Sequence, residues 1–203
     1  GYQSKILRSA ARRPGLGSFG DLGPGALALG EWQALGLELP DLAAMRAYRL
    51  ARVRQELAAR DYAGIVVTDP INLRYATDSA NMQVWCLHNC TRYVFVPTEG
   101  PAVLFDYAQA LHIGANFPLV GEIRPATTWF YMYAGSAEEE RRRARAWARE
   151  IADLVTAHGG GNRRLAIDHI DPRGLQALHD RQIETVDGED IMEIARAIKN
   201  DVE

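Results

Sequence analysis

The spacing of apolar residues predicts two long amphipathic helices. In the first, which starts near Pro40, the apolar positions recur about every 3.6 residues: Leu42, Met45, Leu50, Val53 and Leu57. Its arginines fall mostly on the other face and are interpreted as solvated. The second starts at Ser136, within a segment that resembles a capping box, and its apolar face carries Trp147, Ile151, Leu154 and Val155. Each helix is therefore expected to bury one face.

Shorter apolar runs predict strands between and after these helices. Residues 64–68 read as a buried strand that ends before Pro70, because proline has no amide donor. Residues 92–97 and 102–106 alternate around a glycine-containing loop, which is the pattern of a β-hairpin. Further strands are predicted at 119–123, 164–168 and 183–186, and further helices at 107–117, 172–181 and 189–199. This order predicts an α/β fold with a mixed β-sheet flanked by helices.

Two segments have no simple period. Residues 1 to about 30 are rich in Gly and Pro, which predicts an extended N-terminal arm, with a structureless tail as the alternative. A short turn of helix is expected at 31–35, anchored by Trp32. The aromatic stretch 127–133 is expected to be a strand or the wall of a pocket. We divide the chain into an arm (1–40), an α/β domain (41–190) and a terminal segment (191–203).

Composition and charge narrow the class of protein. A chain of 203 residues, 47% hydrophobic and 24% charged, is large enough for one well-buried domain. A formal net charge of −3 provides no broad cationic field, so nucleic acid is not expected as a partner. No segment is long and apolar enough to predict a membrane partner. The two cysteines are too close in sequence for a disulfide that would join distant segments of the fold. A cytoplasmic, reducing location is therefore expected.

Residues 69–89 concentrate polar, aromatic and sulfur-bearing side chains, which is typical of a binding surface. Cys86, His88 and Cys90 alternate, so on a strand they would share a face. Alternate strand residues lie roughly 6.5 Å apart, whereas two ligands of one zinc are at most about 4.5 Å apart. Packed cysteines beside a pocket histidine are therefore favoured over a metal site.

Two other candidates have simpler structural explanations. Asp168, His169 and Asp171 follow a predicted strand, where α/β sheets often bind ligands, but an Asp N-cap before Pro172 is the simpler explanation and is favoured. The glycines at 159–161 follow a helix and precede a strand, the reverse of a phosphate loop, so they are interpreted as a helix C-terminus. Neither a nucleophile elbow nor a zinc-protease motif occurs in the sequence. No catalytic residue is assigned.

Residues 45–203 resemble the N-terminal domain of the creatinase, prolidase and aminopeptidase P superfamily. The segment 64–77 is similar to the family's strand followed by N-x-x-Y-x-T/S, and residues 195–203 resemble the start of its linker helix. Segments 29–40, 76–89 and 159–162 look most like the dimethylsulfoniopropionate lyases of this fold. The resemblance implies a mixed sheet with a ribonuclease H-like motif and a linker helix that begins at 191–203.

The resemblance also implies where chemistry occurs in such proteins. A pair of divalent metals, zinc, manganese or iron, is expected in a C-terminal catalytic domain that follows this chain, and no cofactor is expected in the chain itself. The N-terminal domain would support a homodimer and place side chains over the partner's active site, facing a small-molecule or short-peptide substrate. By position, the expected pocket residues are Tyr75, Asp78, Trp85, His88 and Arg92, with Trp129 or Tyr131 in an aromatic wall for an onium cation.

The sequence departs from the lyase pattern between Trp85 and His88, where Cys86-Leu87 replaces Asn-Thr. The substrate therefore stays open between dimethylsulfoniopropionate and an Xaa-Pro peptide. A binding module without catalysis is the alternative, because the same fold serves as a recognition domain in a histone chaperone. A stand-alone enzyme that uses Asp168 and His169 would require turnover by the 203-residue chain, which is not expected.

Overall fold

The chain forms one six-stranded mixed β-sheet in the computed structural model, which describes residues 25–38, 40–114 and 117–203. The strands are β1 (Gly64–Val67), β2 (Tyr93–Pro97), β3 (Ala102–Asp106), β4 (Val120–Pro125), β5 (Arg164–Ile167) and β6 (Glu184–Asp187), in the order β4-β3-β2-β1-β5-β6. β2 pairs antiparallel with β1 and β3, while β1–β5, β5–β6 and β3–β4 are parallel pairs. The predicted mixed sheet and the hairpin are confirmed.

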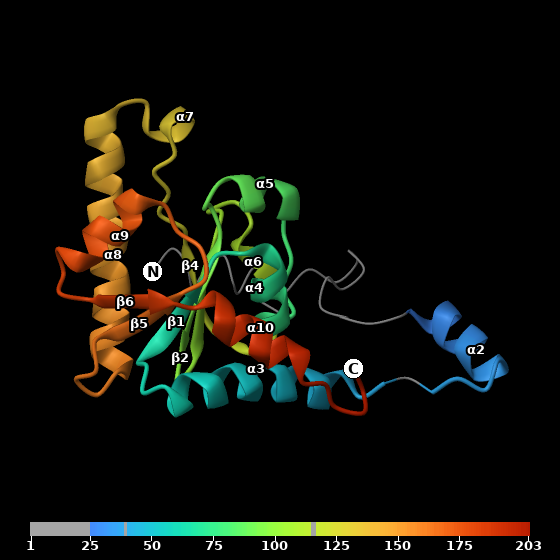
Figure 1. The fold of residues 1–203 in the computed structure, drawn as a ribbon. Coiled ribbons are helices and arrows are strands. Elements are labelled where there is room, and N and C mark those ends of the chain that lie inside the picture. Colours follow the sequence, from blue (N-terminus) through green and yellow to red (C-terminus); the bar gives the residue numbers. More distant parts are fainter. Residues whose placement is uncertain (1–24, 39, 115–116) are drawn as a thin grey trace.

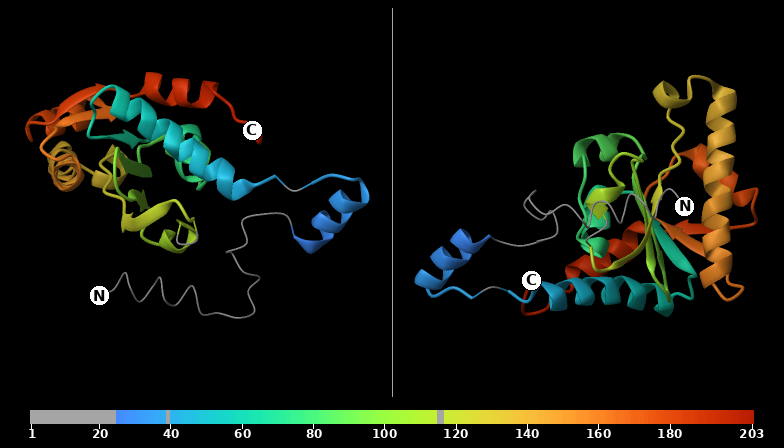
Figure 2. Two further views of the ribbon diagram at one scale, coloured as in Figure 1. Left: turned by 90° about the horizontal axis from the view of Figure 1, so that it is seen from below. Right: turned by 180° about the vertical axis from the view of Figure 1, so that it is seen from behind.

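Helices cover both faces of the sheet. They are α2 (Ala26–Ala34), α3 (Leu42–Ala59), α4 (Pro70–Thr77), α5 (Gln83–His88), α6 (Leu111–Gly114), α7 (Tyr131–Ala134), α8 (Ala137–His158), α9 (Pro172–His179) and α10 (Glu189–Ala197). Figure 1 shows α8 and α9 on one side of the sheet, with α3 and α10 along the other. Figure 2 shows the same layers from below and from behind, with α2 away from the sheet. No residue of α2 is buried.

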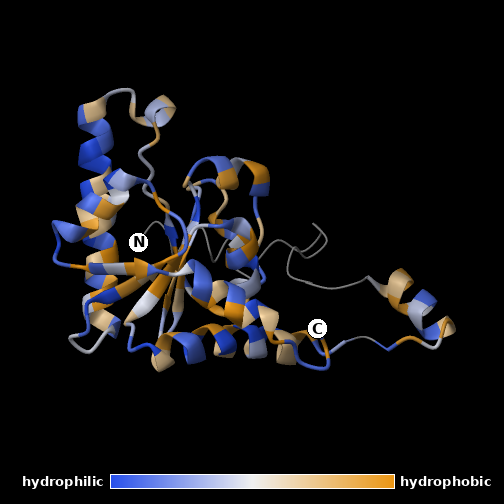
Figure 3. Cartoon of the chain, in the orientation of Figure 1, coloured by the Kyte–Doolittle hydropathy of each residue, from blue (hydrophilic) through white to orange (hydrophobic). Residues whose placement is uncertain are grey.

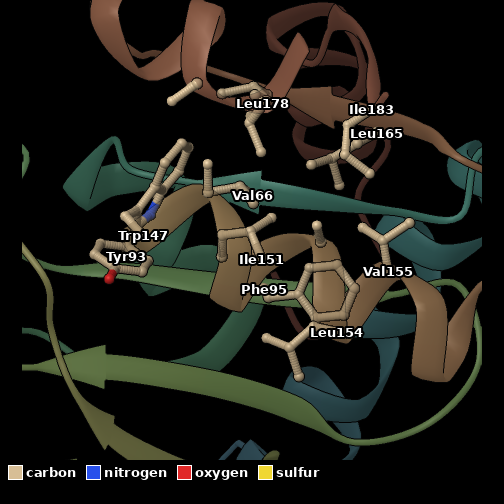
Figure 4. Packing of buried hydrophobic residues seen from close by; sticks show 14 of the residues in the cluster. Val66, Tyr93, Phe95, Trp147, Ile151, Leu154, Val155, Leu165, Leu178 and Ile183 are labelled. Atoms are coloured by element: carbon tan, nitrogen blue, oxygen red, sulfur yellow. The ribbon is translucent and has the colours of Figure 1, made fainter. Parts of the chain in front are cut away.

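The strands read as continuous apolar runs because both of their faces are covered. In β1, Val66 points into the core beneath α8, while Ile65 and Val67 point into the core beneath α3. The α8-side core includes Tyr93, Phe95, Trp147, Ile151 and Leu178, and the α3-side core includes Val53, Leu57, Val94, Leu104 and Ile191. Figure 4 shows the interlocking side chains of the α8-side core. Figure 3 shows the strands mainly in apolar colours, with polar positions on the outer side of α8.

The predicted helix termini are confirmed by their hydrogen bonds. The Asp41 carboxylate accepts from the Ala44 amide, and the Ser136 hydroxyl accepts from the Glu139 amide at 3.2 Å. α8 ends at the glycine run, where two residues adopt positive φ values of 57° at Gly160 and 98° at Gly161. This left-handed backbone favours glycine, so the run closes a helix, as predicted.

Two predicted elements are wrong at their boundaries or in type. Residues 127–130 are irregular and Tyr131–Ala134 form a single helical turn, so the aromatic stretch is not a strand. The chain leaves the sheet at Pro125, the end of the edge strand β4, and Trp129 then packs into the α8-side core. α2 begins at Ala26, earlier than the predicted turn at 31–35, because the Ala-Leu-Ala-Leu run has high helix propensity. Most of the predicted arm lies in residues 1–24, outside the described residues.

The end of the chain also differs from the expected continuous helix. α10 ends at Ala197, and Ile198 is extended with φ −92° and ψ 112°. The Asn200 side chain then accepts from the amides of Val202 and Glu203, both at 3.1 Å, as a helix N-cap does. α10 itself packs on α3 through the α3-side core. The boundary at residue 190 between the α/β domain and a terminal segment stays a prediction.

Within the described residues, each helix is too short or too polar to cross a membrane.

We expect Leu178→Ala to lower the free energy of unfolding by about 2–5 kcal/mol, because it opens a cavity in a fully buried site. Leu27→Ala on α2 makes the same chemical change where the side chain is 81% exposed, and should change stability by less than about 0.5 kcal/mol. Urea denaturation followed by circular dichroism measures both. Equal losses would contradict the packing described for α9.

Candidate functional site

A cavity of about 400 Å³ lies at the carboxyl ends of β1 and β5. Its residues come from five separate parts of the chain. They are Thr68, Asp69, Ile71 and Asn72 after β1, the segment 86–90 with Phe130, and Asp168, His169, Ile170 and Asp171 after β5, together with Glu189 and Arg196 on α10. A cavity of this size accommodates a small molecule.

The position of the cavity follows from the sheet topology. β1 and β5 are parallel neighbours, but the helices that follow them lie on opposite faces of the sheet. α4 contributes Leu73 and Tyr75 to the α3-side core, whereas α9 contributes Ala177 and Leu178 to the α8-side core. Helices that diverge in this way open a crevice between the strand ends, which is where open α/β sheets bind ligands.

The Asp168 carboxylate joins the two strand ends at the base of this cavity. One oxygen accepts from the Thr68 amide at 2.8 Å and the Thr68 hydroxyl at 3.2 Å. The other accepts from the Asp69 amide at 3.2 Å and from Asn72 Nδ2 at 3.1 Å. Burial raises the pKa of Asp168, although these hydrogen bonds act in the opposite direction. With two donors on each of its oxygens, the carboxylate is a structural acceptor.

Two more aspartates of the cavity cap helices. Asp69 accepts from the amides of Ile71 and Asn72 at the start of α4, at 2.8 and 3.0 Å. Asp171 accepts from the Gly174 amide at the start of α9, as predicted, and also from Trp129 Nε1 at 2.7 Å. Both carboxylates thus stabilise the helices that diverge from the crevice.

The cysteines do not lie on a strand. Cys86 belongs to α5 and Cys90 follows it, so the premise of a shared strand face is wrong. Burial, and then the charges of Asp168 and Asp171, raise the pKa of the Cys90 thiol far above its usual value, which makes it a poor nucleophile. In the described part of the chain, no group of three or more His, Cys, Asp or Glu side chains is arranged to hold a metal ion. These residues do not fit a metal pair.

Of the seven side chains predicted for a substrate pocket, His88 lines this cavity. Trp85 is half-buried on the same helix and meets Phe130 edge to face, with centroids 5.8 Å apart. Tyr131 is 66% exposed on α7, and Trp129 is buried in the α8-side core. Phe130, which was not singled out from the sequence, therefore takes the aromatic position in the cavity wall, within the aromatic stretch that the sequence did indicate.

The other three side chains make internal contacts. The Tyr75 hydroxyl donates to the Ala195 carbonyl at 2.8 Å, and burial raises its pKa to about 12. Asp78 pairs with Arg46 at 2.7 Å. Arg92 pairs with Asp106 at 2.8 Å, where the two side chains are 2% and 0% exposed. Within the described fold, His88 therefore lines the cavity and Trp85 lies near it, while Tyr75, Asp78 and Arg92 lie elsewhere.

The segment between α4 and α5 carries two non-glycine residues in the left-handed region, Asp78 with φ 60° and Met82 with φ 42°. Such residues each cost of order 1 kcal/mol or more unless neighbouring contacts hold them. The Arg46–Asp78 ion pair is one such contact. The two sharp bends direct α5, with Trp85 and His88, out from the body of the domain, as Figure 1 shows for the helix.

We expect Arg92→Met to lower the free energy of unfolding by about 3–5 kcal/mol, because it leaves the Asp106 carboxylate buried without a counter-charge. The double variant Arg92→Met with Asp106→Asn removes both charges and keeps an oxygen that can accept from Asn81 and the Tyr107 amide. It should recover much of the loss in the same urea titration. A double variant no more stable than Arg92→Met would contradict this role.

Sequence comparison shows which known proteins this chain is similar to. The chain is 43% identical over 179 residues to the dimethylsulfoniopropionate lyase DddP of Roseovarius nubinhibens, an alignment that covers 88% of this chain and 40% of the relative. It is 41% identical, with the same coverage, to the lyase of that name from Roseobacter denitrificans. The chain therefore spans about 40% of the length of the curated relatives it matches.

Solved structures and a family model agree on the domain. An aminopeptidase P, an Xaa-Pro aminopeptidase from Streptococcus thermophilus, superposes with a TM-score of 0.54 at 16% identity, covering 75% of this chain and 98% of that one. At that identity the likeness concerns the fold alone. The family model of the creatinase/prolidase N-terminal domain matches residues 49–198. The chain therefore belongs to the creatinase/prolidase N-terminal domain family.

Proposed function

We propose that this chain is the N-terminal, non-catalytic domain of a metal-dependent enzyme that cleaves dimethylsulfoniopropionate. The observation that carries the proposal is identity above 40% across 88% of the chain to two lyases, of which the chain spans 40%. In this proposal a C-terminal domain holds the divalent metal pair and performs the elimination, in a cytoplasmic homodimer. The domain described here contributes pocket walls and a contact surface.

The end of the molecule that carries α5 and α7 supports a role in contact with another domain or subunit. Several large apolar side chains are exposed there, including Val84 at 86%, Leu87 at 64% and Met132 at 86%. Exposed apolar groups gathered at one end of a domain are typical of an interaction surface. α5 lies below α7 in the upper part of Figure 3, and apolar positions occur along it.

Within this proposal, Trp85 and His88 are the side chains best placed to reach a substrate held by another domain. Both project from α5, and neither makes a hydrogen bond or ion pair inside the described fold. The face of an indole attracts a sulfonium cation electrostatically, which suits Trp85 to a pocket for dimethylsulfoniopropionate. Arg92 would support this wall from behind, because it donates to Ser79 in the segment that leads to α5. Tyr75 and Asp78 contact α10 and α3 instead.

Two alternatives rest on the fold. An Xaa-Pro peptidase is favoured by the likeness to an Xaa-Pro aminopeptidase, which is limited to 16% identity. A binding module without catalysis is supported by the fold and by the exposed apolar side chains at the end that carries α5 and α7. Both are outcomes of the experiment that tests the lyase.

The test begins with the gene. We expect the reading frame to continue past Glu203 into a segment with carboxylate and histidine metal ligands, and the full-length product to release dimethyl sulfide from dimethylsulfoniopropionate, measured by gas chromatography. The 203-residue chain should release none. Hydrolysis of Xaa-Pro dipeptides without dimethyl sulfide would overturn the lyase in favour of a peptidase. Absence of both activities and of bound metal, measured by mass spectrometry, would favour the binding module.

In the full-length protein, we expect Trp85→Ala to lower kcat/KM for dimethylsulfoniopropionate by about ten-fold, because a desolvated cation–π contact contributes on the order of 1–2 kcal/mol. Trp85→Phe keeps an aromatic face and should lose less. Gln83→Ala, an exposed change on the same helix, is the control and should leave kcat/KM unchanged. Equal activity of the Trp85→Ala and Gln83→Ala enzymes would show that Trp85 does not contact the substrate.

A further inference from the structure

Polar contacts, rather than apolar packing, hold α5 on the domain. The structure describes all six of its residues, Gln83–His88, and of these only Cys86 is buried. Val84 and Leu87 are exposed at 86% and 64%. A helix this short is not stable by itself in water, because so few hydrogen bonds do not offset the cost of nucleation. The contacts of Cys86 and of the preceding loop therefore decide where α5 lies.

Two of these contacts hold the loop that leads into the helix. Because β2 and β3 are antiparallel neighbours, the residue before β2 lies beside the last residue of β3. These residues are Arg92 and Asp106, the buried ion pair. Arg92 donates to the Ser79 hydroxyl and, at 3.4 Å, to the Ser79 carbonyl. Asp106 accepts from Asn81 Nδ2 at 3.0 Å. The ion pair thus anchors the loop at two points.

A third contact reaches α5 itself. The Tyr107 hydroxyl lies 3.4 Å from Cys86 Sγ and 2.7 Å from Thr91 Oγ1. Cys86 Sγ in turn donates to the Asn81 carbonyl at 3.4 Å. Burial, and then the hydrogen bond with Cys86, raise the pKa of Tyr107, so its hydroxyl keeps its proton. Since Tyr107 directly follows Asp106, one short segment after β3 anchors both the loop and the helix.

The loop that these contacts hold is strained. It lies between Asp78 and Met82, whose φ values of 60° and 42° are unfavourable for residues other than glycine. The two anchored residues, Ser79 and Asn81, are situated between them. Without their contacts the loop would relax towards commoner dihedral angles, and α5, which begins directly after Met82, would move with it.

The anchoring residues act on the cavity at a distance. Within the described residues, neither Asn81 nor Tyr107 lines the cavity, whereas residues 86–90 form part of its wall. Trp85 lies on the same helix, against Phe130. Asn81 and Tyr107 are neutral side chains, so they influence this wall and Trp85 through the position of α5.

We propose that Asn81 and Tyr107 are positioning residues, which hold α5 so that Trp85 keeps its place beside the cavity. That Trp85 then meets a substrate rests on the proposed function, whereas the anchoring of α5 does not. Because the anchors join α5 to the domain without being part of either apolar core, their loss should open α5 locally and leave the sheet intact.

Amide hydrogen exchange of the ¹⁵N-labelled 203-residue chain tests the anchoring. The amides of Cys86 and Asn89 donate to carbonyls within the 82–89 segment, so they report on the helix. We expect Tyr107→Phe and Asn81→Ala each to speed their exchange by about five- to ten-fold, because each variant removes a contact that holds the helix closed. Exchange at the amides of β1 should stay unchanged.

Both variants keep the buried Arg92–Asp106 pair, so the domain should stay folded. Tyr62→Phe is the control for a lost hydroxyl, since the Tyr62 ring packs on Arg164 at the opposite ends of β1 and β5 from the cavity. Gln83→Ala, an exposed change on α5, is the control for a truncated side chain. Both controls should exchange as the parent does. Exchange in α5 that stays at the parent rate in Tyr107→Phe and Asn81→Ala, or that rises equally in β1, would overturn the proposal.

A double-mutant cycle in the full-length enzyme tests whether the network acts through Trp85. Tyr107→Phe should lower kcat/KM for dimethylsulfoniopropionate about five-fold, but should cause no further loss in an enzyme that already carries Trp85→Ala. Losses that multiply would indicate a general structural role and contradict the positioning of Trp85. If the parent enzyme releases no dimethyl sulfide, the proposed function fails, while the exchange measurement still decides whether the network anchors α5.

Discussion

The Asp168 carboxylate is the contact on which the crevice depends. It accepts hydrogen bonds from the Thr68 and Asp69 backbone and from Asn72, so one side chain fixes the end of β1 against the end of β5. The helices that follow these strands diverge to opposite faces, and without a link between their starting points the backbone amides there would face a gap. The hydrogen bonds of Asp168 hold the two strand ends at a defined separation. The space between the diverging helices is the cavity.

Hydrophobic spacing predicted most of the architecture. Period-3.6 patterns located α3 and α8, and alternation located the β2–β3 hairpin, because these signals reflect burial of one face at a time. β1 was found as a short run with apolar side chains on both faces, which is what a strand between two helical layers requires. The caps at Ser136 and Asp171 were also predicted, since a capping side chain and its amide are three residues apart.

The cavity could not be predicted in the same way. Thr68 and Asp168 are separated by 100 positions, and no local pattern indicates that their strands are neighbours. Arg92 was expected in a pocket from its position in the family resemblance, yet its partner Asp106 allows it to be buried inside the domain. The aromatic stretch was expected to be a strand or a pocket wall; the strand is excluded because the sheet edge at β4 had already been reached, and Phe130 lies in the cavity wall. In each case a tertiary contact decided the outcome.

The order of the strands has a consequence for how the chain folds during synthesis. β1 is a central strand, but its neighbour β5 begins at Arg164, about a hundred residues later. At about 5–20 residues per second, the ribosome needs on the order of 5–20 s to deliver β5 after β1 has emerged. During that interval β1 can pair with β2 on one side only, and its other edge stays open. The high contact order of this pairing favours a slow, late closure of the sheet, and an exposed apolar edge meanwhile invites association with other chains.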